Sequence, residues 1–170
     1  MNKTVNQVAR IGLIFAVAVS SFALATPSFK FTTNAKMNLM ASGNSIEISA
    51  YRKMGLISKK IQASSAVLIF KGNDAVGAYA FYDKALKSED WKDSPDGMMP
   101  KGDAMKEGGA MDKGADMMAA GPVTKADMMM AEKMKMKDGS YHGFYSHMKN
   151  IISLTSKAVG GKVTVTLTIK

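Results

Sequence analysis

The sequence predicts a small α+β domain, in which an antiparallel sheet with one or two helices is interrupted by a long disordered insertion rich in methionine. Three observations predict this class. Several short stretches alternate apolar and polar residues, which is the period of a half-buried strand. One stretch near the C-terminus has helical spacing. Residues 98–139 combine Gly, Lys, Asp and Met without a pattern that would bury them.

Residues 1–25 are typical of a signal peptide. Lys3 and Arg10 precede the apolar stretch IGLIFAVAVSSF, and Ala23-Leu24-Ala25 has the small-x-small pattern that a signal peptidase cleaves. We expect a mature chain that begins at Thr26, is periplasmic or secreted, and has no transmembrane segment. An uncleaved N-terminal anchor is the alternative.

The first part of the domain, residues 26–97, contains strand patterns. SIEISAY, residues 45–51, alternates Ile46 and Ile48 with polar residues, which predicts a strand. The apolar runs 66–70 and 75–82 flank the turn-like sequence 71–74, so we expect them to form a hairpin. A short helix over 82–91 is a further prediction.

The last part, residues 140–170, is expected to complete the domain with a helix and a strand. Phe144, Met148, Ile151 and Ile152 have the spacing of one helix face, and Gly160-Gly161 would end that helix. In the final stretch VTVTLTI, apolar residues alternate with threonines. Because all but one of these residues are β-branched, this is the clearest predicted strand.

The insertion 98–139 contains eleven of the sixteen methionines. Met99, Met105, Met111 and Met117 are six residues apart, and a helix turns by about 240° over six residues, so they would share no helix face. Glycines and prolines also disfavour a strand, which leaves flexible coil as the prediction for 98–118. Residues 125–138 have better helix propensity, and such a helix could end at Gly139.

Charge and composition limit the possible partners. The formal net charge is +9, and residues 140–170 hold four lysines and no acid. This basic surplus favours anionic envelope surfaces such as lipid headgroups or acidic glycans. We expect no nucleic acid partner, because the chain has no basic and aromatic recognition pattern. The chain also has no cysteine, which excludes disulfides, thiolate ligands and a cysteine nucleophile.

Methionine thioethers are good ligands for soft ions such as Cu(I) and Ag(I) and poor ones for hard ions. In composition the chain resembles the methionine-rich copper- and silver-handling proteins of bacterial envelopes, although it has no family motif. We therefore expect a non-catalytic protein that binds Cu(I) or Ag(I) through closely spaced donors and otherwise has no cofactor. The predicted metal ligands are Met128, Met129, Met130, Met134, Met136, His142, His147 and Met148.

Two other functions fit the same composition. Exposed methionines capture oxidants as sulfoxides that a reductase can repair, and this needs no particular geometry. Alternatively, the basic domain attaches to an envelope surface and the methionines supply an adaptable apolar contact. Catalysis is not expected, because the two histidines and the dispersed acids form no recognised catalytic motif.

Overall fold

The structure is a computed structural model that describes residues 27–33, 45–94 and 121–170. The expected signal peptide, residues 1–25, lies outside the described residues. The methionines of the six-residue repeat, Met99 to Met117, also lie outside them.

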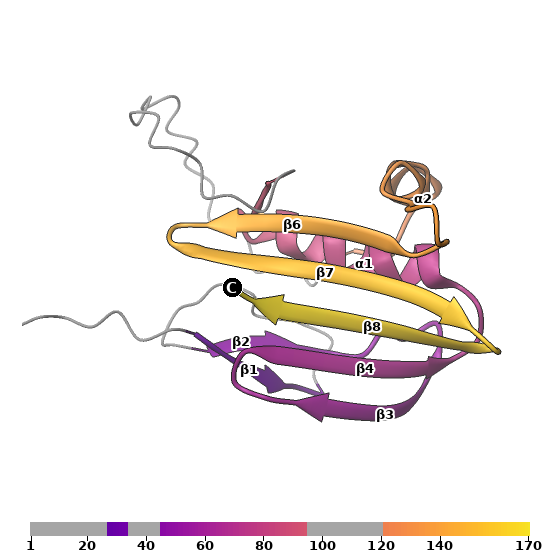
Figure 1. Cartoon of the computed structure of the whole chain (residues 1–170), viewed down its shortest axis with the longest axis horizontal. Helices are drawn as coiled ribbons and strands as arrows, with labels where there is room; N and C mark the ends of the chain where they lie inside the picture. The colour runs from indigo at the N-terminus through magenta and orange to yellow at the C-terminus, as the bar shows by residue number, and fades with distance from the viewer. Residues whose placement is uncertain (1–26, 34–44, 95–120) are drawn as a thin grey trace, which may run out of the picture.

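A six-stranded antiparallel sheet forms the centre of the molecule, in the order β3-β4-β8-β7-β6-β5 (Figure 1). A separate parallel pair, β1 with β2, precedes it along the chain. The expected α+β class is therefore confirmed, with a mostly antiparallel sheet and two helices. The strands are β1 Ser28–Phe31, β2 Ser45–Ile48, β3 Gly55–Ile61, β4 Ser65–Lys71, β5 Lys92–Asp93, β6 Tyr141–His147, β7 Asn150–Val159 and β8 Lys162–Ile169.

Three strand predictions are confirmed. The patterns at 45–51, 66–70 and 163–169 correspond to β2, β4 and β8. In β4 and β8 every second residue is buried, because the sheet has one face toward the core. Sequence reasoning did not predict β1, β3 or β5. β3 is mostly exposed, and β5 has only two residues, so neither shows an apolar alternation.

The run 75–82 is not the second strand of a hairpin, so that prediction is wrong. It begins the helix α1, Ala75–Ser88, which covers one face of the sheet (Figure 1). Asp74 caps the helix, since its side chain accepts a hydrogen bond from the backbone N–H of Gly77 at 2.8 Å. Ala78, Tyr82 and Ala85 are buried at helical spacing. The helix extends to Ser88 and so overlaps the short helix expected over 82–91.

The helix predicted around 144–152 is also wrong, because this stretch forms the hairpin of β6 and β7. His147 pairs with Asn150, so the chain turns at Met148 and Lys149. β-Branched residues and the alternation of β7 fit a pleated surface better than a helix. Gly160-Gly161 ends an element as expected, but that element is β7. Both glycines have positive φ, 56° and 72°, as a tight turn between strands requires.

The described part of the predicted insertion, residues 121–139, contains the helix α2, Lys125–Glu132. Thr124 and Asp127 form a capping box at its start. Asp127 also accepts a hydrogen bond from Lys84 of α1 at 3.0 Å. The Thr124 backbone and Lys84 lower the pKa of Asp127 to about 2. Together these contacts hold α2 against α1.

The two faces of the six-stranded sheet differ. The inner face carries the core side chains of β4, β7 and β8, including Leu68, Leu154 and Val165, and packs against α1. We call the opposite side the outer face; Figure 1 looks onto it, with α1 behind the strands. The outer-face threonines Thr164 and Thr166 are only partly buried. Neither described helix has the length and apolar sequence needed to cross a membrane.

Candidate functional site

The eight predicted metal ligands fall into three separate places. Met134, Met136 and His142 line one groove beside β6. His147 and Met148 line a different hollow at the far end of the same strand. Met129 and Met130 are 64% and 65% exposed on α2, whereas Met128 is partly buried and packs against the core. Three of the eight predicted residues therefore line the same groove.

Backbone pairing positions the two methionines of the groove. After α2, the Met136 N–H donates to the carbonyl of Ser140 at 2.7 Å, and the His142 N–H donates to the carbonyl of Met134 at 3.2 Å. Lys135 and Tyr141 form the bridge between these two hydrogen bonds. The segment 134–136 thus lies along the edge of β6 next to His142.

Asp138 stabilises the turn that returns the chain to β6. Its carboxylate accepts hydrogen bonds from the backbone N–H and the hydroxyl of Ser140, at 3.1 and 2.6 Å. Lys157 of β7 forms an ion pair with the same carboxylate at 2.7 Å. Lys157 and Ser140 hold the pKa of Asp138 well below its usual range. These contacts fix the turn that follows the methionine segment, and α2 precedes the segment, so it is anchored at both ends.

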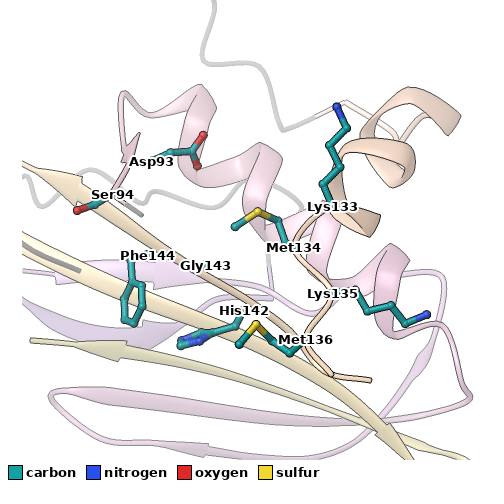
Figure 2. Close-up of a pocket in the computed structure, with 9 residues that line it drawn as sticks. All are labelled: Asp93, Ser94, Lys133, Met134, Lys135, Met136, His142, Gly143 and Phe144. Atoms are coloured by element: carbon teal, nitrogen blue, oxygen red, sulfur yellow. The ribbon is translucent and has the colours of Figure 1, made fainter. Parts of the chain in front are cut away.

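The groove has a volume of about 480 Å³ and is open to solvent. It lies between the end of β5, which contributes Asp93, and the methionine segment (Figure 2). Figure 2 draws the Met136 thioether next to the imidazole of His142, and Met134 across the β6 ribbon from them. Methionine has an unbranched side chain with several rotatable bonds, so the thioethers can turn toward an ion in the groove.

The imidazole of His142 is suited to bind a metal in its neutral form. Partial burial lowers the pKa of His142, and the nearby positive charge of Lys170 lowers it further. Both effects favour the neutral ring, which is the form that binds a metal. Phe144 packs against it with the ring centroids 4.5 Å apart, and the Lys170 ammonium lies 4.4 Å from the centroid of Phe144.

A buried chain of polar groups supports the strand beneath the groove. The Tyr79 hydroxyl lies 2.8 Å from the Tyr145 hydroxyl, which in turn donates to Asp83 at 2.7 Å. Burial raises the pKa of Tyr145 far above its usual value, with Tyr79 and Asp83 adding to the effect. Lys87 pairs with Asp83 at 2.9 Å and with Asp93 at the groove at 3.2 Å. These polar contacts therefore connect Asp93 at the groove with α1.

The hollow at the far end of β6 has fewer donors. His147 packs against Trp91 with centroids 5.5 Å apart, and its Nδ1 lies 3.3 Å from the Asp90 carbonyl. Met148 is 81% exposed. Asp90 and Met148 are the two non-glycine residues with positive φ in the described chain, at 61° and 52°. His142 and His147 are five positions apart on β6, and because five is odd the two rings lie on opposite faces of the sheet.

Only Met134, Met136 and His142 of the groove were predicted from the sequence; Phe144 and Asp93 are among the lining residues that were not. The alternation in YHGFYSH would have found Phe144, because as a strand it puts His142 and Phe144 on one face. Asp93 follows a helix in the sequence and gives no such signal. Among the described residues, no three His, Asp or Glu side chains come together to hold a metal ion. The candidate donors of the groove are thus mainly thioethers and one imidazole.

Comparisons with protein-family models, with curated proteins and with solved structures find no match for this chain.

Proposed function

We propose that this chain is a non-catalytic protein that binds Cu(I) or Ag(I), with the groove of Met134, Met136 and His142 as its principal site. The observation that carries the proposal is the grouping of these three donors. Two thioethers and a neutral imidazole, from two segments joined by backbone hydrogen bonds, line one open groove. Soft monovalent ions prefer this donor set over the oxygen-rich sets that suit Mg²⁺ or Ca²⁺.

The chemistry of the ligands suits an exported protein. The chain has no cysteine, so thioethers are its only soft donors. We propose that the protein acts in the periplasm or outside the cell, where free thiols would oxidise and thioethers persist.

The proposal is tested by titrating the chain from Thr26 onward, which contains every described element, with Cu(I) against a competing chelator. Replacing Met134 and Met136 by Leu keeps their size and removes both sulfurs. We expect the affinity to fall at least about tenfold, because even changes to the outer partners of metal ligands cost that much. The affinity of a His142→Asn variant should fall similarly.

The matched control replaces Met129 and Met130 by Leu. It also removes two exposed sulfurs, but these lie on α2 and do not line the groove. We expect its affinity for Cu(I) to stay within twofold of the unmodified chain. Equal losses in both double variants would refute the groove as the principal site, and the absence of saturable binding would refute the function.

Oxidant capture is the second candidate, and the exposure of the methionines favours it. Met129, Met130 and Met148 are all more than half exposed, so a peroxide can reach their sulfurs. In this reaction the thioether sulfur is oxidised to a sulfoxide and the peroxide is reduced to water or an alcohol. Rapid, reductase-reversible oxidation of these residues, without Cu(I) binding, would support this function instead.

A further inference from the structure

Charge is distributed unequally between the two sides of the six-stranded sheet. The outer face carries lysines at both ends of the strands and on the β3 edge. No outer-face position in the described strands is acidic. The acids of the described chain lie instead on β2, on the two helices and their flanks, and at Asp93, with Asp138 in its turn as the exception. The outer-face lysines are Lys60, Lys71, Lys92, Lys157, Lys162 and Lys170.

Two of these lysines lie directly opposite each other. Lys71 of β4 pairs in register with Lys162 of β8. Their neighbours Phe70 and Val163 are both fully buried on the inner face, so alternation puts both lysines on the outer face. Like charges at directly opposed positions destabilise a sheet. No acid in the described part of the chain forms an ion pair with either lysine.

Between the lysines, the outer face carries a row of threonines together with the partly buried Val67 and Ile69 of β4. Thr164, Thr166 and Thr168 stand in a row on β8, next to Thr155 of β7, and all four residues are partly exposed. The lysines surround this area and do not follow a single line across it. An extended acidic polymer would be bound best by lysines arranged along one line. Lysines spread over a whole face fit a flat anionic surface better.

We propose that the outer face docks on an anionic lipid bilayer. Phosphate headgroups would lie between Lys71 and Lys162 and offset their mutual repulsion, while the threonine hydroxyls donate hydrogen bonds to headgroup oxygens. Each lysine near such a surface adds attraction that falls off within a Debye length. This docking does not depend on metal binding, because lysines and threonines make the contact; of the groove residues, His142 and Phe144 of β6 lie on the outer face.

The experiment measures binding of the chain from Thr26 onward to vesicles of phosphatidylcholine with 30% phosphatidylglycerol, a fraction of about a third chosen to give a strongly anionic surface. Vesicles of phosphatidylcholine alone serve as the neutral surface. We expect binding to the anionic vesicles only, weakened by added salt. A variant with Lys60, Lys71 and Lys162 replaced by Gln should bind roughly 100-fold more weakly at low salt.

A charge-matched control replaces Lys30, Lys53 and Lys125 by Gln. These lysines are exposed and lie outside the six-stranded sheet. The control should keep its vesicle binding. Equal losses in the two triple variants would overturn the proposal, as would the absence of binding to anionic vesicles or tighter binding to the acidic polysaccharide alginate than to vesicles.

A melting-temperature measurement distinguishes lost vesicle binding from misfolding of the variant. Replacing Lys71 by Gln removes the repulsion of Lys162, so the melting temperature should rise or stay constant while vesicle binding falls. A residue with a purely structural role would show the opposite change in melting temperature. If Lys71→Gln melts at a lower temperature and binds vesicles as before, the proposal is wrong.

Discussion

The two ends of β6 offer soft ligands in different ways. At its start, Met134 and Met136 come from a segment that pairs with the strand through backbone hydrogen bonds, so both line the same groove as His142. At its end, His147 and Met148 are neighbours in the chain, and the hairpin leaves Met148 almost fully exposed. Adjacency in the sequence gives a pair of donors, whereas backbone pairing between two segments adds a third donor to the same groove.

The strongest test of this comparison removes the support under the groove. A Cβ atom on Gly143 would collide with the Tyr79 hydroxyl and crowd that of Tyr145. Gly143→Ala therefore has to break the buried hydroxyl chain, and we expect the free energy of unfolding to fall by about 3 kcal/mol. Denaturant unfolding followed by circular dichroism measures the change.

Gly55→Ala is the matched control, because a Cβ there meets no atom within 4 Å. Its free energy of unfolding should change by less than about 1 kcal/mol, since Ala fits a strand at least as well as Gly. Similar losses for the two variants would mean that the hydroxyl chain does not support the groove.

A second test separates the two ends by spectroscopy. Trp91 is the only tryptophan in the chain and packs against His147. Because the groove has more donors, the first equivalent of Ag(I) should leave the Trp91 emission unchanged, and later equivalents should quench it. A Met148→Leu variant should require more Ag(I) for the same quenching. Quenching by the first equivalent would reverse the assignment of the principal site.

The smallest expected effect concerns pH. The pKa of His142 lies below its usual value of 6.5. The folded state therefore holds fewer protons at this ring than the unfolded state, so stability falls as the pH drops below about 6.5 and levels off below the folded pKa. Cu(I) affinity should decrease over the same range, because the protonated ring cannot bind the ion.

The Lys170→Gln variant tests the cause of the lowered His142 pKa. Without the ammonium, the pKa of His142 should rise toward its usual value, although burial still lowers it. Titration of the imidazole proton signals by NMR measures the shift. An unchanged pKa would show that Lys170 does not act on this ring.

The sequence predicted strands that are long enough, and buried enough on one face, to show a clear apolar pattern. β8 alternates over its whole length, and the fully apolar centre of β4 is bounded by clear turn residues. The errors arose where two periods fit the same residues. The run from Ala75 to Tyr82 is apolar at almost every position, so its alanines read equally as strand or helix until Asp74 is recognised as a cap.

The sequence predicted which residues could bind a metal but not which of them lie together. Met134, Met136 and His142 were all predicted ligands, because their chemistry is visible in the sequence. What joins them is the bridge of Lys135 with Tyr141, which depends on where the turn at Gly139 returns the chain. Treating 144–152 as a helix hid that pairing, since His142 was then placed before a helix and not on a strand edge.

The odd spacing of the two histidines has a further consequence. Their α-carbons lie about 16 Å apart along an extended strand, and the imidazoles leave it in opposite directions. No rotation of side chains within one molecule can bring both rings to the same ion. Spectroscopic detection of a bis-imidazole centre formed by His142 and His147 would therefore be a signature of two molecules meeting through that ion.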